Sequence, residues 1–125
     1  MTEFSYPREL RILTGEGFQK VFNDTTLKVP DQPLLILARA NELDHPRIGF
    51  VISKKNVRHA VKRNRVRRII RESFRLNQHQ LPAVDMVILA RRGLGDMEQD
   101  ELHALMKKCW SRLKKKAQKA KQKQS

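Results

Sequence analysis

Basic side chains are concentrated between positions 54 and 75 of the sequence, where ten cations accompany a single acid, Glu72. On a solvated helix face lysines normally alternate with glutamates, because like charges one turn apart repel each other. Seven of the ten cations are arginines, whose planar guanidinium binds phosphate through two hydrogen bonds and stacks on bases. The uncompensated charge therefore predicts a nucleic-acid ligand. The cations are Lys54, Lys55, Arg58, Lys62, Arg63, Arg65, Arg67, Arg68, Arg71 and Arg75.

Helical periodicity separates this segment into an apolar side and a basic side. At 100° per residue one stripe forms, opposite the arginines, whereas Val57 and Val61 are out of phase with it. We therefore expect a regular helix from near Lys62, preceded by a loop or irregular turn over 54–61. Asn64 lies among the arginines, and its amide can both donate and accept hydrogen bonds toward bases, sugars or bound water. The stripe consists of Val66, Ile69, Ile70, Ser73 and Phe74.

No set of side chains in the sequence is suited to catalysis or to metal binding. The four histidines share no metal-ligand spacing, and the single cysteine, Cys109, cannot complete a zinc site. Cys109 lies on an apolar stripe and is predicted to belong to the core. We therefore expect a non-catalytic chain that binds no metal or cofactor of its own.

Length and charge define the class of protein further. A chain of 125 residues suits one domain, and its net charge of +14 predicts salt-sensitive binding to a polyanion. The N-terminal residues do not resemble a signal peptide, and no apolar run approaches the length of a membrane span. With one cysteine and hence no internal disulfide, the sequence predicts a cytoplasmic protein.

The remaining sequence predicts an α+β sandwich of order α-β-β-β-α-β-α with a four-stranded sheet. Residues 1–13 read as an extended lead-in, and Thr14 is a candidate N-cap for a short helix. Strands are expected over 25–29, 34–38, 47–53 and 84–90. Asp96 and Gln99 resemble a capping box for a last helix. We predict one domain over 1–113 and a basic, disordered tail over 114–125.

A second candidate surface lies on the predicted strand 47–53. Alternation places Gly49, Val51 and Ser53 on one face, which leaves a shallow concavity flanked by Arg47 and Arg91. Two aromatic residues of the first helix, Phe18 and Phe22, have two interpretations. They are either core residues or groove-lining residues that stack on unpaired bases.

The segment 62–74, Lys-Arg-Asn-Arg-Val-Arg-Arg-Ile-Ile-Arg-Glu-Ser-Phe, resembles the signature of the bacterial ribonuclease P protein family, proteobacterial type. Further blocks follow in family order, and the resemblance covers roughly residues 6–113. Many relatives carry glycine where this chain has Val57 or Arg58. The blocks are Pro7–Arg11, Phe18–Phe22, Arg47–Gly49, Ser53–Val57 and the strand that ends in Ala90 and Arg91.

The resemblance implies a ribonucleoprotein that removes the 5′ leader of precursor tRNA, with catalysis by its RNA subunit and Mg²⁺ acting through that RNA. It also implies a left-handed β-α-β crossover and no obligate protein partner. The implied contacts with the catalytic RNA are Lys54, Lys55, Arg58, Lys62, Arg63, Asn64, Arg65, Arg67, Arg68 and Arg71. The implied leader cleft contains Phe18, Phe22, Val51, Ser53 and Arg91, with Arg47 beside it.

Two other functions compete with this interpretation. A ribosomal or RNA-chaperone protein would use a similar basic α+β fold, with the lysine tail as an arm. A sequence-specific DNA-binding protein would need a two-helix reading unit or a dimer seam, and neither is visible.

Overall fold

Four strands form one mixed sheet in the computed structural model, which describes residues 15–124. The predicted lead-in over 1–13 and the Thr14 cap lie outside the described residues. The sheet order is β1-β2-β4-β3, in which β2 is antiparallel to both of its neighbours and β3 is parallel to β4. The strands are β1 (Leu27–Pro30), β2 (Leu34–Ala40), β3 (Arg47–Val51) and β4 (Val84–Ala90).

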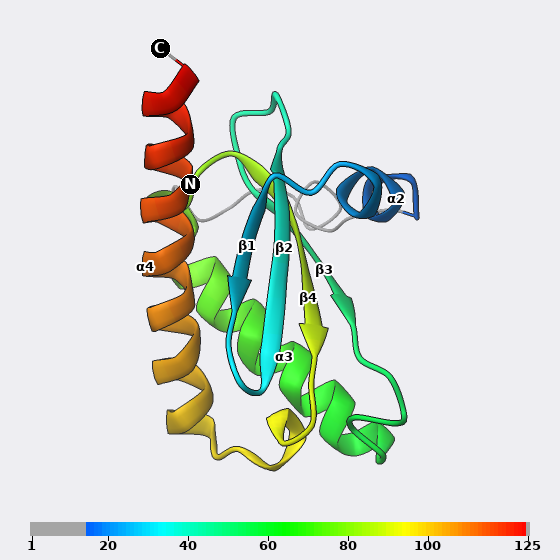
Figure 1. Cartoon of the computed structure of the whole chain (residues 1–125). Helices are drawn as coiled ribbons and strands as arrows, with labels where there is room; N and C mark the ends of the chain where they lie inside the picture. Colours follow the sequence, from blue (N-terminus) through cyan, green and yellow to red (C-terminus); the bar gives the residue numbers. More distant parts are fainter. Residues whose placement is uncertain (1–14, 125) are drawn as a thin grey trace.

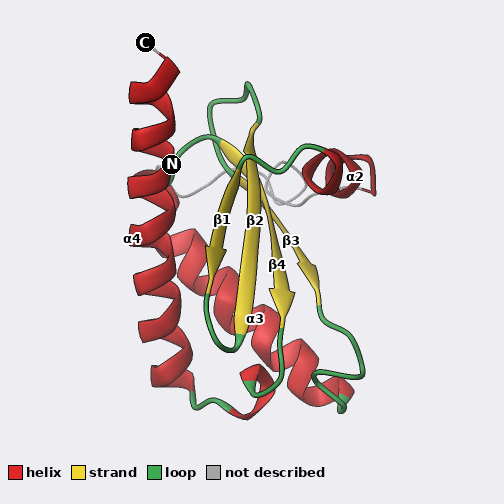
Figure 2. Cartoon of the chain, viewed as in Figure 1, coloured by secondary structure: helices red, strands yellow, loops and turns green. Residues whose placement is uncertain are grey.

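Helices cover both faces of this sheet. Two long helices lie on one face and the short helix α2 lies on the other, as Figures 1 and 2 show. The element order and the α+β class agree with the prediction. The helices are α2 (Gly15–Asn23), α3 (Ala60–Asn77) and α4 (Gln99–Gln124), with 3₁₀ turns η1 (Gln78–Gln80) and η2 (Leu94–Asp96).

The connection from β3 through α3 to β4 is left-handed. In Figure 1 both strands run toward the bottom of the view, β4 lies to the left of β3, and α3 passes behind the sheet. Right-handed crossovers are the strong rule for parallel strands, so this connection is an exception. The sequence resemblance predicted it, whereas the periodicity of the chain contains no signal for it.

The main core lies between the sheet and the two long helices. All five residues of the predicted stripe on α3 are buried. Trp110 of α4 packs edge-on against Phe74, with ring centroids 6.2 Å apart, and its Nε1 donates a hydrogen bond of 2.9 Å to Ser73 Oγ. The one hydroxyl in the stripe thus satisfies the one polar atom of the tryptophan.

Strand ends differ from the prediction by one or two residues in β1, β2 and β3, and the starts of the two long helices differ as well. Helix α3 begins at Ala60, two residues early, because His59 already has extended backbone and acts as the N-cap. The capping box of α4 is built from Glu98 and Glu101, the backbone N–H of Glu98 donating to Glu101 Oε1 at 2.9 Å. Asp96 instead belongs to η2.

The predicted disordered tail also needs correction. Helix α4 continues through 114–124, although this part of the chain has no apolar stripe. Lysine, alanine and glutamine all have high helix propensity. The ammonium group of Lys116 also donates to the backbone oxygen of Lys28, which ties the extension to β1.

We expect Ser73→Ala to destabilise the protein by about 1–3 kcal/mol, because it leaves the indole N–H of Trp110 buried without an acceptor. Urea denaturation measures this loss. Glu72→Ala, at the neighbouring exposed position of α3, is the control and should change stability by no more than about 0.5 kcal/mol. Equal effects of the two substitutions would contradict a structural role for the buried hydrogen bond.

Candidate nucleic-acid interface

The outer face of α3 carries the cations of the predicted RNA-binding set. Burial of the apolar stripe under the sheet turns this face toward solvent, where Asn64, Arg68 and Arg75 are exposed. No acidic residue lies in the first turn, although acids there would be favoured by the helix dipole. The face is therefore arranged for an external anion rather than for the stability of the isolated helix.

The loop before α3 is held in place by close packing. Val57 is 2% exposed and fills the space beside Gly95, where an added Cβ would lie 2.7 Å from its Cγ1. The side chain of Asn56 donates to the Ala90 backbone oxygen at 3.0 Å. Lys54, Lys55 and Arg58 project from this anchored loop and are exposed.

Three cations of the set contact the protein itself. Arg63 Nη1 donates to the backbone oxygens of Val57 and Arg58, both at 3.0 Å, and so closes the loop onto the helix. Arg65 Nη1 donates to the Met97 oxygen at 2.9 Å. Lys62 lies 2.6 Å from Asp96, and its hydrogen bond holds the pKa of that carboxyl below the ordinary value. These three residues hold the loop and η2 against α3, and they also contribute positive charge to the candidate interface.

The other cations of α3 are less engaged. Arg67 donates to the side-chain oxygen of Asn64 at 3.1 Å, which orients the amide. The guanidinium of Arg71 lies over the ring of Phe50, 5.6 Å from its centroid. Lys54, Lys55, Arg58 and Arg68 have charged groups that make no hydrogen bond or ion pair within the part of the chain that the structure describes. These four are the most available to a phosphate.

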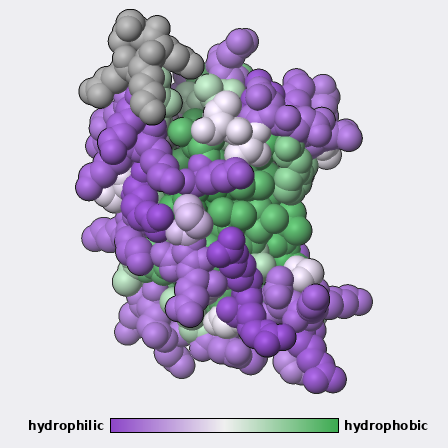
Figure 3. Space-filling model, in the orientation of Figure 1, coloured by the Kyte–Doolittle hydropathy of each residue, from purple (hydrophilic) through white to green (hydrophobic). Residues whose placement is uncertain are grey.

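The opposite face of the sheet forms an apolar surface beside α2. Strand register aligns three rows across it: Arg39, Asp85 and Arg47; Leu37, Val87 and Gly49; Leu35, Leu89 and Val51. Helix α2 covers the middle row through Val21 and Phe18. The third row is only partly covered, and Figure 3 shows apolar surface over the strands beside α2.

The two aromatic residues of α2 have different roles. The ring of Phe18 lies so close to Gly49 that a Cβ there would be 2.4 Å from its Cζ. Phe18 is thus a packing residue, as the first of the two interpretations held. Phe22 is 46% exposed and remains available to a ligand. Val51 is 38% exposed and lies in the third row of this apolar surface, beside Leu89.

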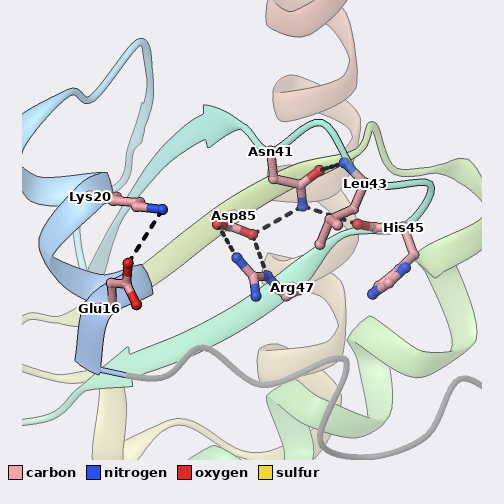
Figure 4. A network of polar contacts seen from close by, with 7 residues as sticks. All are labelled: Glu16, Lys20, Asn41, Leu43, His45, Arg47 and Asp85. Carbon is pink, nitrogen blue, oxygen red and sulfur yellow. Dashed lines mark hydrogen bonds and ion pairs between the residues drawn. The ribbon is translucent and has the colours of Figure 1, made fainter.

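Arg47 is engaged by the buried Asp85 at one end of this apolar surface. Its Nε and Nη2 each lie 2.7 Å from an oxygen of Asp85, which also accepts from Asn41 Nδ2 at 3.0 Å. Figure 4 shows this network, and Lys20 on α2 lies beside it. The Asp85 hydrogen bond raises the pKa of Arg47. No local sequence pattern indicates that Asp85 pairs with Arg47, because 37 residues separate them.

The other predicted groove residues lie beyond the ends of the strands. Ser53 follows β3 and its Oγ accepts from the backbone N–H of Asn56 at 3.3 Å. Arg91 follows β4, and its Nη1 donates a hydrogen bond of 3.0 Å to the backbone oxygen of Asp31. Arg47, at the start of β3, and Arg91, after the end of the parallel strand β4, therefore lie at opposite ends of the apolar surface, and each makes a contact within the protein.

The described residues contain no group of three or more His, Cys, Asp or Glu placed to hold a metal ion. Cys109 is fully buried, and this burial, with a smaller effect of Asp31, raises its pKa to about 11. The thiol therefore stays protonated near neutral pH, and Cys109 belongs to the core, as predicted. Over the same range of residues, no helix has the length and apolarity required to cross a membrane.

Comparison with known proteins shows which family has this sequence and fold. The sequence matches the family model for ribonuclease P over residues 6–114. It is 54% identical over 113 residues to the ribonuclease P protein component of Pseudomonas putida (strain GB-1), covering 90% of this chain and 84% of that protein. Identity to the Chromohalobacter salexigens protein component is 50% over 115 residues, 92% of this chain and 90% of the relative.

Solved structures give the same result. The RNase P protein from Staphylococcus aureus superposes with a TM-score of 0.70 at 28% identity, covering 91% of this chain and 93% of that one. The RNase P protein from Thermotoga maritima gives 0.68 at 25% identity, covering 76% and 89%.

The fold and the site thus define a small basic RNA-binding protein that works as a subunit of a ribonucleoprotein. The chain belongs to the ribonuclease P protein family. Its role is that of the protein subunit in the 5′ maturation of tRNA. This assignment replaces the ribosomal and RNA-chaperone alternative.

We expect Gly49→Ala to destabilise the protein by about 1–3 kcal/mol, because the new methyl group must displace the ring of Phe18. Gly15→Ala is the matched control, since nothing lies within 4 Å of a Cβ at that position. Urea denaturation compares the two. If Phe18→Ala does not reduce the penalty of Gly49→Ala in a double-mutant cycle, the clash is not its cause.

Proposed function

We propose that the chain binds the catalytic RNA of ribonuclease P through α3 and the loop 54–59. The observation that supports this proposal most strongly is the row of cations on the outer face of α3, whose charge the protein itself leaves largely unneutralised. Arginines and Asn64 suit both phosphates and base edges. If about six to eight cations meet phosphates, log affinity falls by roughly 4–7 units per tenfold rise in salt.

The RNA subunit carries out the hydrolysis in this proposal, with Mg²⁺ acting through the RNA. A protein without a catalytic set supports this division of roles, since a folded RNA needs its backbone charge neutralised. The complex acts in the cytoplasm, and no further protein partner is required.

The 5′ leader of precursor tRNA is the second ligand. Its single strand lies in the groove between α2 and the sheet, with Phe22 available for stacking and Val51 in the floor. Stacking on an aromatic ring tolerates any base, which suits leaders of differing sequence. The buried Asp85 keeps Arg47 in one orientation at the end of the groove.

Reconstituted cleavage tests the proposal. The isolated chain should cleave nothing, and together with its cognate RNA it should restore processing of precursor tRNA at low Mg²⁺. Arg67→Ala combined with Arg68→Ala should weaken RNA binding and lower the salt slope by about 1.5, at 0.7–0.9 per phosphate contact. The matched variant Arg67→Lys with Arg68→Lys keeps the charge and should keep most of the slope. No gain in cleavage from the wild-type chain would refute the assignment of this subunit role.

Phe22→Ala should weaken binding of leader-bearing precursor by about 1–3 kcal/mol, the usual contribution of base stacking, and leave mature tRNA unaffected. Leu76→Ala is the control, because Leu76 of α3 is equally exposed at 46% and lies away from the groove. Equal losses for precursor and mature tRNA, or a fall in melting temperature alone, would remove Phe22 from the leader site.

A further inference from the structure

Helix α4 contains a second group of cations, and no acid follows Glu101 in the sequence to balance them. From Leu102 to the end of the sequence there is no Asp or Glu, and nine lysines and arginines occur. Lysines 115, 119 and 123 are spaced at i, i+4, where like charges destabilise a helix. The nine are Lys107, Lys108, Arg112, Lys114, Lys115, Lys116, Lys119, Lys121 and Lys123.

Three of these cations fix α4 to the β1 edge of the sheet. Lys108 and Arg112 lie 3.1 and 3.5 Å from the Asp31 carboxylate, and Arg112 also donates to the Pro30 oxygen at 2.9 Å. Lys116 donates to the Lys28 oxygen. Burial opposes ionisation of Asp31, but Lys108 and Arg112 together hold its pKa below the ordinary value. The cations on this side of α4 therefore have a structural role within the protein.

Four lysines on the other side have no such role. Lys107, Lys114, Lys115 and Lys119, here the α4 lysine face, are exposed. Within the described part of the chain their ammonium groups make no hydrogen bond or ion pair. At 100° per residue they fall within about 140° of one another, opposite the buried side of α4. Ser111 and Gln118 lie between them and are exposed and uncharged.

Neither the helix dipole nor a membrane explains this face. The dipole favours cations only in the last turn, and the α4 lysine face begins more than four turns before Gln124. An interfacial membrane helix needs a free apolar side. The apolar side of α4 is buried in the core, through Leu102, Met106 and Leu113.

The position of the face separates it from α3. Helix α4 is tied to β1, which is one edge strand of the sheet. Helix α3 reaches the other edge strand, β3, where Arg71 covers Phe50. Figure 1 shows α4 beside β1 and the start of α3 near the end of β3, on opposite sides of the view. One short RNA segment therefore does not serve both surfaces.

We propose that the α4 lysine face binds the phosphate backbone of a segment of the RNA partner that is separate from the segment on α3. This inference rests on the proposed function, since it takes the RNA subunit as the partner. Lysine is a compact charge without the planar fork of arginine, so the face recognises backbone and not base edges. Its span from 107 to 119, about 18 Å at 1.5 Å per residue, covers several successive phosphates.

The salt dependence of binding tests this proposal on the full chain and its cognate RNA. Lys107→Gln, Lys114→Gln and Lys115→Gln combined should lower the slope of log affinity against log salt by roughly 2–3, at 0.7–0.9 per contact. The matched triple Lys→Arg variant keeps the charge and should keep the slope. Adding the Arg67→Ala and Arg68→Ala pair should lower the slope further by its own amount, because the sites are independent.

The outcomes separate the two proposals. A wild-type slope for the triple Gln variant, with a reduced slope for the α3 pair, overturns the inference and leaves the proposed function intact. Wild-type slopes for both sets overturn both. If wild-type protein binds anionic vesicles and the triple Gln variant does not, while the two bind RNA equally well, the face is assigned to a membrane instead.

A tethered probe locates the segment. An iron chelate on Ser111→Cys lies in the centre of the face, and the buried Cys109 stays unlabelled. In the holoenzyme it should cut the RNA backbone at nucleotides different from those cut by a chelate on Glu72→Cys of α3. Absence of cutting, or cutting at the same nucleotides, would overturn a second RNA contact. Wild-type protein treated with the same reagent is the control.

Discussion

The cations on the outer face of α3 repel one another, and the helix is stable because its inner face is buried under the sheet. Val66, Ile69, Ile70 and Phe74 each contribute on the order of 1.5–3 kcal/mol when fully buried. A like-charge pair one turn apart on the outer face costs only a few tenths of a kcal/mol. Hydrophobic burial therefore exceeds the repulsion, and the unneutralised charge remains available to a partner. The Ser73–Trp110 hydrogen bond fixes α4 against the same helix and completes the support.

The arginines of α3 fall into two groups when contacts are considered along with charge. Arg63 and Arg65 bind backbone oxygens of the neighbouring loop and of Met97, so they determine where the interface lies. Arg68 and the loop residues Lys54 and Lys55 are exposed and carry charge outward. The same distinction applies in the groove, where Arg47 is paired with Asp85 while Phe22 remains free to contact a ligand. A basic residue in a family signature can thus be part of the scaffold, of the binding surface or of both.

Periodicity predicted the elements that depend on local pattern, including the α3 stripe and the order of strands and helices. It could not predict contacts between distant residues. The pairing of Arg47 with Asp85 depends on the register of β3 against β4, and the packing of Val57 on Gly95 depends on the turn after β4. The left-handed crossover came from resemblance alone. Periodicity does not predict the extension of α4, because residues 114–124 have no apolar stripe; helix propensity and the contact of Lys116 with β1 favour it instead.

Strand β3 joins the proposed leader groove to the proposed catalytic-RNA surface on α3 through consecutive residues. Gly49 faces the groove and receives the ring of Phe18, whereas Phe50 faces the other way and lies beneath Arg71. A displacement of this edge strand that follows binding on one surface reaches the other within a single residue. Thermodynamic linkage then requires reciprocity: the factor by which catalytic RNA changes the affinity for the leader equals the factor by which the leader changes the affinity for that RNA. The two ligands of one small protein would in this way report on each other's presence.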